Sequence, residues 1–315
     1  MAIVDVHAHL MSSNFTPKSY WDSWISLSSQ LSGKPTALIE KRMPEFWDET
    51  GELLIKDMDV AGVDQSWISV LDYGLSKTGE AHYSVEEQNR LYAEIAQGSR
   101  NRLIAFFGID PRRDGAIKLL ETGVNEWGLK GLKLLPAAGF YPNSEECRDL
   151  YAKAMELGIP VLVHTGPEIL PFYSKFCYPV FLDEVANDFP ELTLILAHAG
   201  FCWWQEALNI ASTKPNVYLD LAGWQPKTRR HPIEEFYKPL RIMIDTIGPS
   251  RILFGSDWPA LRLFGGGESS WVRSFTEPPE SVREAGITFT KAEIDAILGQ
   301  NAARLLNKEY KERQR

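Results

Sequence analysis

The chain has 315 residues, of which 44% are hydrophobic and 24% are charged. These proportions are typical of a globular protein with a large core, and they exclude a disordered or fibrous chain. The formal net charge of −9 argues against a broad binding surface for nucleic acid or for an anionic membrane. We therefore expect a small molecule as the partner.

Eight short runs rich in Val, Ile, Leu and Phe recur along the chain, with helical patterns between them. They predict strands at residues 2–9, 66–71, 103–109, 131–136, 160–165, 192–199, 216–222 and 251–257. Strands that alternate with helices form parallel sheets, and eight of them close most simply into an α/β (β/α)8, or TIM, barrel. The length suits one barrel, so we predict a single domain over residues 1–315.

Helix starts and long connections complete this outline. Ser84 with Glu87, and Thr290 with Glu293, have the spacing of capping boxes. Long loops are predicted after the first and last strands, at residues 10–50 and 260–280. In a barrel both rise from the C-terminal face, where active sites lie.

The sequence also suggests where the protein resides. No apolar run approaches the roughly 20 residues that span a bilayer, and the first residues lack the pattern of a secretory signal. The three cysteines are widely spaced and form no Cys-x-x-Cys motif, which speaks against a disulfide framework or a thiolate zinc site. We expect a cytoplasmic protein without membrane contact. A homo-oligomer is compatible with these observations.

The first predicted strand carries a His-x-His pair. Side chains alternate along a strand, so Asp5, His7 and His9 are expected on one face and Val6 on the other. The inward face of a barrel strand leads to the active-site mouth. The pair is therefore predicted to point into the barrel, with Asp5 below it as a structural residue or a partner of the histidines.

Polar residues also end three later strands. The same alternation places His164 above Leu162 on the fifth strand and His198 above Leu196 on the sixth. Asp257 ends the eighth strand. Because the carboxyl ends of parallel strands meet at one end of a barrel, these side chains are expected to converge with the His-x-His pair.

This convergence predicts a metal site. Three neutral imidazoles and one carboxylate, from His7, His9, His164 and Asp257, suit one divalent ion and leave room for water or substrate. Zinc is favoured, and Mn, Fe or Co would also fit. A single strand histidine is more often a hydrogen-bonded core residue, and Asp257 alone could cap a helix. For all four residues to have such ordinary roles at these positions would require four independent coincidences.

Six segments carry a resemblance to a known family. They are DVHAHL, GLKLLP, VLVHTG, LILAHAG, LFGSDWP and LGQNAARLL. Together they resemble the amidohydrolase-related family, the branch of the amidohydrolase superfamily that includes aminocarboxymuconate-semialdehyde decarboxylase and many metal-dependent hydrolases. The resemblance covers nearly the whole chain. It implies the same four metal ligands, with His198 near the metal as an acid, base or electrostatic stabiliser.

The resemblance leaves two reactions open. His-x-His on the first strand is used by hydrolases and by the muconate-type decarboxylase, whereas Trp258 stands where many decarboxylases have tyrosine. Our leading prediction is hydrolysis of an amide or lactone by a metal-activated water. Asp257 would transfer the proton and His198 would hydrogen-bond the developing oxyanion.

The alternative is nonoxidative decarboxylation of an aromatic or dienoic acid, which needs a cationic clamp for the carboxylate. Arg42 or Arg262 could supply one, although each is more often a solvated surface charge. Trp21 and Trp24 could form an aromatic wall over the site, or simply pack the loop against the barrel. A non-catalytic sensor is less favoured, because a sensor needs no acid–base set beside its metal.

Lys133 is a separate candidate on the fourth strand. In binuclear amidohydrolases a carbamylated lysine on this strand bridges two metal ions, and the position of Lys133 in GLKLLP allows that role. An unmodified lysine there would instead contact substrate or a neighbouring carboxylate. We favour the unmodified lysine and one metal ion.

Overall fold

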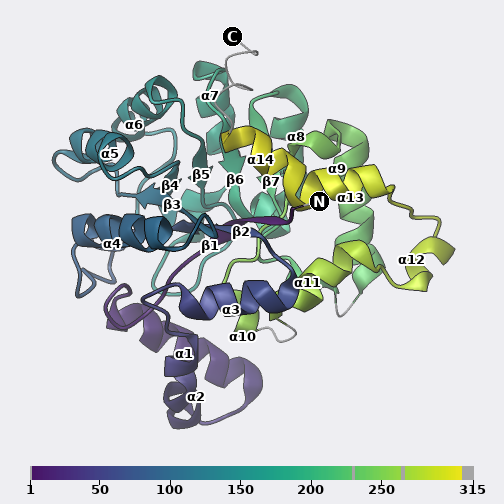
Figure 1. Cartoon of the computed structure of the whole chain (residues 1–315), viewed down its shortest axis with the longest axis horizontal. Helices are drawn as coiled ribbons and strands as arrows, with labels where there is room; N and C mark the ends of the chain where they lie inside the picture. The colour runs from purple at the N-terminus through teal and green to yellow at the C-terminus, as the bar shows by residue number, and fades with distance from the viewer. Residues whose placement is uncertain (1, 229–230, 264–266, 307–315) are drawn as a thin grey trace.

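The computed structural model describes residues 2–228, 231–263 and 267–306. Eight parallel strands pair in chain order, and helices surround them (Figure 1). The backbone N–H of Val6 donates to Phe254 O (2.9 Å) and that of His9 to Trp258 O (2.7 Å), which links β1 to the segment at and after β8. The predicted TIM barrel is confirmed. Its strands are β1 (Val4–Ala8), β2 (Gln65–Ser69), β3 (Leu103–Gly108), β4 (Leu132–Leu134), β5 (Val161–Val163), β6 (Leu194–Leu196), β7 (Val217–Asp220) and β8 (Ile252–Leu253).

The helices alternate with these strands. Both predicted capping boxes are present, since the side chains of Ser84 and Thr290 accept from the N–H groups of Glu87 and Glu293. The α-helices are α1 (Lys18–Ser32), α2 (Thr36–Arg42), α3 (Glu52–Ala61), α4 (Val85–Gly98), α5 (Ala116–Asn125), α6 (Glu145–Glu156), α7 (Phe181–Asp188), α8 (Trp204–Thr213), α9 (Lys238–Ile247), α10 (Ala260–Leu263), α11 (Gly267–Thr276), α12 (Glu280–Glu284), α13 (Lys291–Asp295) and α14 (Asn301–Leu306).

The two long connections are present but largely helical. The first contains α1 and α2, which stand apart from the ring of helices (Figure 1). The second contains α10 and α11, with residues 264–266 outside the described part. Among the described helices, none combines the length and apolar character that a membrane span requires. The cytoplasmic location and the single domain stay predictions.

Hydrophobic residues pack on both faces of the strands. Inside the barrel, Trp67 and Phe106 stack with ring centroids 4.9 Å apart and share a buried cluster with Leu162, Ile195 and Leu253. The residues that alternate with these, such as Ile68 and Leu134, belong to the larger outer cluster beneath the helices. Hydrophobic side chains therefore fill the interior of the barrel, and the polar groups lie above them at the mouth.

The predicted alternation on β1 was wrong for Asp5 and Val6. The register against β2 shifts between Asp5 and Ala8, so that one extra residue lies on β1. Val6 consequently joins the interior cluster, while Asp5 bonds to Ser66. A bulge of this kind reverses the side-chain alternation that sequence spacing assumes.

The alternation on β6 was also wrong. Ile195 and Ala197 belong to the interior cluster, and Leu196 to the outer one. Regular strand geometry ends at Leu196, and His198 has a left-handed backbone (φ 59°). This turn, and not strand alternation, brings the His198 ring into the mouth.

A second cluster lies at the C-terminal end of the barrel, and we call it the rim cluster. Its residues come from the first long connection and from the segments after β2, β4 and β5, so it covers that side of the mouth. It consists of Met11, Tyr20, Trp21, Ile25, Met43, Phe46, Tyr73, Leu135, Ala137, Phe172 and Cys177.

Candidate metal centre

Three of the predicted ligands form one group, which we call the ligand cluster: His7, His9 and Asp257. One potential donor atom from each lies within 4.8 Å of the others. The Nε2 atoms of His7 and His9 are 3.0 Å apart, and Asp257 Oδ1 is 3.7 Å from the first and 3.8 Å from the second. The Asp257 N–H donates to His7 O (2.8 Å), which fixes the carboxylate beside the pair.

Hydrogen bonds define the tautomers of both imidazoles. His7 Nδ1 lies 2.5 Å from Asp220 Oδ2, and His9 Nδ1 lies 2.8 Å from the carbonyl oxygen of Ser69. Because both partners are acceptors, each Nδ1 carries the proton and each Nε2 carries a lone pair. Burial, followed by the charge of Lys133, lowers the pKa of both histidines well below the usual range, which favours the neutral form.

The ligand cluster fits a cation. Two lone pairs that face each other at 3.0 Å, with a carboxylate beside them, repel unless a positive charge or a donor lies between them. Neutral imidazoles and a carboxylate are the donors that zinc and its neighbours prefer. These residues could therefore hold a divalent metal ion, as the sequence predicted.

Lys133 points inward, a direction that the sequence analysis left open. Its side chain is buried, and Nζ lies 3.0 Å from His7 Nε2. Burial lowers the pKa of Lys133 to about 8, although the nearby Asp257 and Asp220 oppose this shift. Lys133 thus supplies the positive charge nearest to the His7 lone pair among the described residues.

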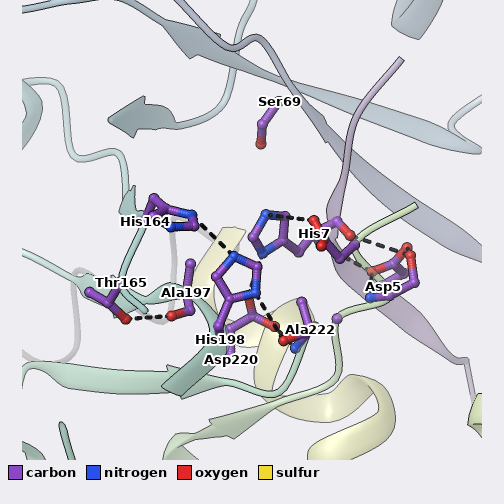
Figure 2. Close-up of polar contacts among 12 residues, drawn as sticks. Asp5, His7, Ser69, His164, Thr165, Ala197, His198, Asp220 and Ala222 are labelled. Atoms are coloured by element: carbon purple, nitrogen blue, oxygen red, sulfur yellow. Dashed lines mark hydrogen bonds and ion pairs between the residues drawn. The ribbon is translucent and has the colours of Figure 1, made fainter. Parts of the chain in front are cut away.

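His164 and His198 form the opposite side of the mouth. His164 Nδ1 is 3.2 Å from His198 Nε2, and Figure 2 shows both rings together with that of His7 around a common space. His198 Nδ1 donates to the carbonyl oxygen of Ala222 (2.9 Å), so its Nε2 carries a lone pair in the neutral form. The structure thus places His164 next to His198, outside the ligand cluster.

The backbone is unusual at both predicted catalytic residues. His198 has φ 59° and Asp257 has φ 57°, a region that residues other than glycine rarely adopt. Such conformations persist where the surroundings impose them, and they concentrate at functional sites. Here Trp224 Nε1 donates to His198 O (2.7 Å), which helps to hold the left-handed turn.

Asp220 was missed by the sequence analysis. It ends β7, is fully buried and binds His7 Nδ1. A carboxylate in this position orients a ligating imidazole and increases its basicity. Gly255 makes room for it, because a Cβ atom there would collide with Asp220 Oδ1. The available signal was an aspartate at the end of an otherwise apolar strand.

Asp5 does not share that role. Its carboxylate accepts from the backbone N–H groups of His7 (3.0 Å) and Ser256 (2.8 Å), and from the hydroxyl groups of Ser66 (2.9 Å) and Ser256 (2.7 Å). In Figure 2 it lies beyond His7, away from His164 and His198. Asp5 therefore joins β1 to β2 and to the segment after β8, the structural role that the sequence analysis also considered.

Glu168 was also missed. It follows β5, and its Oε1 lies 3.4 Å from His164 Nε2, while its side chain is only 15% exposed. Burial raises the pKa of Glu168 to about 7. Nothing in the sequence marks this residue, because it stands in an irregular segment four positions after His164.

The four predicted substrate-contact residues separate into two pairs. Trp21 is buried in the rim cluster and Trp24 packs against it. The guanidinium group of Arg42 pairs with Glu45 (3.0 Å) on the surface. Arg262 Nη1 binds Asp57 Oδ2 (2.8 Å), which also accepts from Trp258 Nε1 (3.0 Å). Arg262 thus connects the segment after Asp257 to α3.

Comparison with known proteins identifies relatives of the chain. A family model described as amidohydrolase matches residues 4–308. The uncharacterized protein y4mH of Sinorhizobium fredii is 26% identical over 38% of this chain and 40% of its own length. An L-fucono-1,5-lactonase of Burkholderia ambifaria is 31% identical over 28% of this chain and 34% of its own length. The chain thus spans well under half the length of these relatives.

Solved structures match over nearly the full length. An uncharacterized TIM-barrel protein from Bordetella bronchiseptica has a TM-score of 0.68 at 20% identity, covering 99% of this chain and 100% of its own. The 5-carboxyvanillate decarboxylase LigW from Sphingomonas paucimobilis has 0.64 at 15% identity, covering 97% and 98%. An amidohydrolase from Burkholderia multivorans with bound zinc has 0.65 at 18% identity, covering 97% and 99%. At 15–20% sequence identity, these similarities support the fold alone.

Proposed function

The chain belongs to the amidohydrolase family, and we propose that it is a metal-dependent hydrolase that cleaves a lactone or amide bond of a small organic molecule. His7, His9 and Asp257 would hold one divalent ion, with His164 as a further ligand and zinc as the proposed metal. The observation that carries this proposal is the pair of Nε2 lone pairs, on His7 and His9, that face each other beside Asp257. The lactonase among the relatives and the bound zinc in a structural neighbour support it.

The metal ion and the protein side chains would have different roles in the reaction. The ion that these residues would hold would supply an activated water, with a pKa lowered toward about 7, and a positive charge to polarise a carbonyl group. Asp257 accepts a proton at its carboxylate and returns it to the leaving group. Its side chain is 22% exposed, so the carboxylate is accessible from the mouth. Burial raises the pKa of Asp257 above its ordinary value.

His198 has a more restricted role than the sequence suggested. Its Nδ1–H donates to Ala222, so the neutral ring offers only an acceptor at Nε2. His198 can therefore donate a hydrogen bond to a developing oxyanion only after it gains a proton and becomes an imidazolium. We assign it to proton transfer at Nε2, with oxyanion stabilisation in the charged form.

Decarboxylation is the second candidate. It is favoured by Lys133, a buried ammonium group at the site that could bind a substrate carboxylate. It is disfavoured because both predicted arginine clamps are engaged elsewhere, Arg42 with Glu45 and Arg262 with Asp57. Glu168 also places a carboxylate beside His164, where a substrate anion would be repelled.

The test is a product assay on zinc-loaded protein. Lactones, amides and aromatic acids would be incubated with the protein, while acid release and carbon dioxide release are recorded in parallel. We expect acid release from a lactone or amide without carbon dioxide. Carbon dioxide release from an aromatic acid, with no acid release from any lactone or amide, would replace the hydrolase proposal by the decarboxylase.

A further inference from the structure

Four consecutive residues with positive φ angles form the turn that follows β6, and we call them the β6 turn. The angles are 59° at His198, 45° at Ala199, 74° at Gly200 and 53° at Phe201. Residues other than glycine visit this region singly at most, because their Cβ atom then lies too close to the following carbonyl oxygen. A run of four with a single glycine therefore needs contacts from other segments to hold it.

The segment after β7 supplies two such contacts, and we call residues 224–227 the β7 loop. Trp224 Nε1 donates to His198 O (2.7 Å), and Lys227 Nζ donates to Phe201 O (3.1 Å). The two donors also contact each other, since Lys227 Nζ lies 3.8 Å from the centre of the Trp224 ring. The first and last carbonyl groups of the β6 turn are thus bound by one short loop.

The same loop binds the backbone beside Asp257. Gln225 is buried, and its Nε2 donates to Ser256 O (2.6 Å), directly before Asp257 with its φ of 57°. Because a carbonyl oxygen can only accept, this contact fixes which end of the Gln225 amide faces Ser256. Gln225 Oε1 has no hydrogen-bond partner among the described residues, so the bond to Ser256 is the polar contact that this side chain makes there.

The β7 loop is itself tightly placed against His198. A Cβ atom at Gly223, the residue before the loop, would lie 3.0 Å from His198 Nδ1. The Trp224 side chain is fully buried, and the Lys227 N–H donates to Trp224 O (3.0 Å). A buried loop with internal bonds has few alternative conformations, so it can impose its geometry on both turns.

We infer that the β7 loop holds the left-handed backbone at His198 and at Asp257 together. Trp224 and Gln225 act in it as positioning residues for the two groups proposed to transfer protons. A displacement of about 1 Å at a reacting group can lower a rate by about 10². The effect of the loop on turnover rests on the proposed hydrolase function, whereas its effect on backbone geometry does not.

The competing explanation is that Trp224 only fills the core, where its ring centroid lies 6.4 Å from that of Phe236. Thr165 would then hold the β6 turn, because its Oγ1 accepts from the Gly200 N–H (3.1 Å). The two explanations differ in what a glycine within the turn does. Glycine adopts positive φ without strain, so it relieves a turn that has lost its contacts but adds nothing to a core that has lost packing.

The first experiment compares crystal structures of zinc-equilibrated protein and needs no substrate. Trp224→Phe keeps an aromatic ring and removes the N–H group. We expect His198 Nδ1, 2.9 Å from Ala222 O in the wild type, to leave hydrogen-bonding distance in this variant and to return in Trp224→Phe/Ala199→Gly. An unchanged β6 turn in Trp224→Phe, or a displaced turn that glycine does not restore, would overturn the inference.

A second variant covers the case in which Trp224→Phe does not fold, as judged by circular dichroism. Lys227→Met removes the donor to Phe201 O at a partly buried side chain. We expect Lys227→Met to displace the β6 turn at Phe201, and Ala199→Gly to reverse that displacement. A β6 turn that keeps its wild-type backbone in Lys227→Met would contradict the role of the loop.

Turnover of dihydrocoumarin, a lactone, by zinc-loaded protein measures the positioning. We expect Trp224→Phe and Gln225→Leu each to lower kcat by about tenfold or more, with KM within about threefold of the wild type. Ala199→Gly should restore kcat of Trp224→Phe to within about threefold. Unchanged kcat in both single variants would overturn the positioning role, and a rise in KM alone in Gln225→Leu would make Gln225 a substrate contact instead.

Trp271→Phe is the matched control. Trp271 is also buried, and its Nε1 donates to a backbone carbonyl group outside the β6 turn, that of Gly255 (2.8 Å). Ala199→Gly should therefore bring no gain in kcat to Trp271→Phe. An equal gain in both backgrounds would contradict a specific action on the turn. If the wild type hydrolyses no lactone or amide, the proposed function fails, and the crystal structures alone decide whether the β7 loop holds the turns.

Discussion

The two sides of the mouth differ in how completely their polar groups are satisfied. On the β1–β8 side, each imidazole has a fixed Nδ1 partner, namely Asp220 for His7 and the Ser69 carbonyl for His9. On the β5–β6 side, His164 Nε2 has no hydrogen-bond partner among the described residues, and Glu168 Oε1 lies 3.4 Å from it. The protein thus fixes the orientation of His7 and His9 and leaves their Nε2 lone pairs for a metal ion, whereas His164 has no such fixed partner at Nε2.

This difference suggests a division of labour. Groups that hold a metal must keep their geometry, and residues on strands with buried hydrogen-bond partners achieve that. Groups that recognise a substrate must exchange partners when it binds, and unpaired donors and acceptors near a rim can do so. The comparison predicts that loss of the Nδ1 partner on the β1–β8 side weakens metal binding, and that loss of His198 on the β5–β6 side lowers turnover while the metal is retained.

The largest expected effect is at Asp257, which belongs to the ligand cluster and also transfers the proton. We expect Asp257→Asn to lower kcat by about 10⁴, because the amide cannot accept the proton. Steady-state kinetics with saturating zinc measures this loss. A variant with wild-type turnover would show that Asp257 does not transfer the proton. It would also contradict the roles assigned to the two sides of the mouth.

His198 tests the β5–β6 side. We expect His198→Asn to retain zinc and to lose about 10² in kcat, because proton transfer at Nε2 is removed while the ligand cluster is intact. Zinc analysis and kinetics on the same preparation check both parts. Loss of zinc with unchanged turnover per bound metal would show that His198 acts as a ligand.

Asp220 tests the β1–β8 side. Asp220→Asn replaces the carboxylate partner of His7 Nδ1, and we expect zinc affinity to fall by about 10-fold to 100-fold. A competition titration with a zinc chelator measures the affinity. Asp245→Asn, the same substitution at a largely exposed side chain, serves as the control and should bind zinc like the wild type. Equal zinc affinities in Asp220→Asn and Asp245→Asn would contradict the proposal that Asp220 orients His7 for metal binding.

The smallest expected effect concerns Lys133 in the metal-free protein. Its pKa is about 8 in the folded protein, below the ordinary value of 10.5 for lysine, so between these pH values the unfolded chain binds more protons than the folded one. The contribution of Lys133 to the free energy of unfolding therefore rises with pH in this window, by up to about 1.4 kcal/mol per pH unit. Urea unfolding of wild type and Lys133→Met should show this difference in slope. Identical slopes would mean that Lys133 keeps an ordinary pKa.

The barrel and the positions of its polar strand ends were predictable from the sequence. Apolar runs of strand length at regular spacing predicted all eight strands, and His7, His9 and Asp257 are brought together as their strand-end positions implied. Local signals are sufficient there because parallel strands in a barrel share one carboxyl end.

The remaining features depend on contacts between distant segments. The bulge in β1 and the left-handed turn at His198 are set by neighbouring strands and by Trp224, so spacing alone gave the wrong face for Asp5. The pairing of Asp220 with His7 joins residues 213 positions apart. Glu168 lies in an irregular segment, where sequence patterns carry little information about direction.

The central claim is that His7 and His9 direct two lone pairs at one divalent ion. Elemental analysis of the purified, zinc-equilibrated protein tests it most directly, alongside the His7→Ala/His9→Ala double variant with its fold checked by circular dichroism. We expect about one equivalent of zinc per chain in the wild type and none retained by the folded double variant. A folded double variant that keeps a full equivalent of zinc would contradict this account of the site.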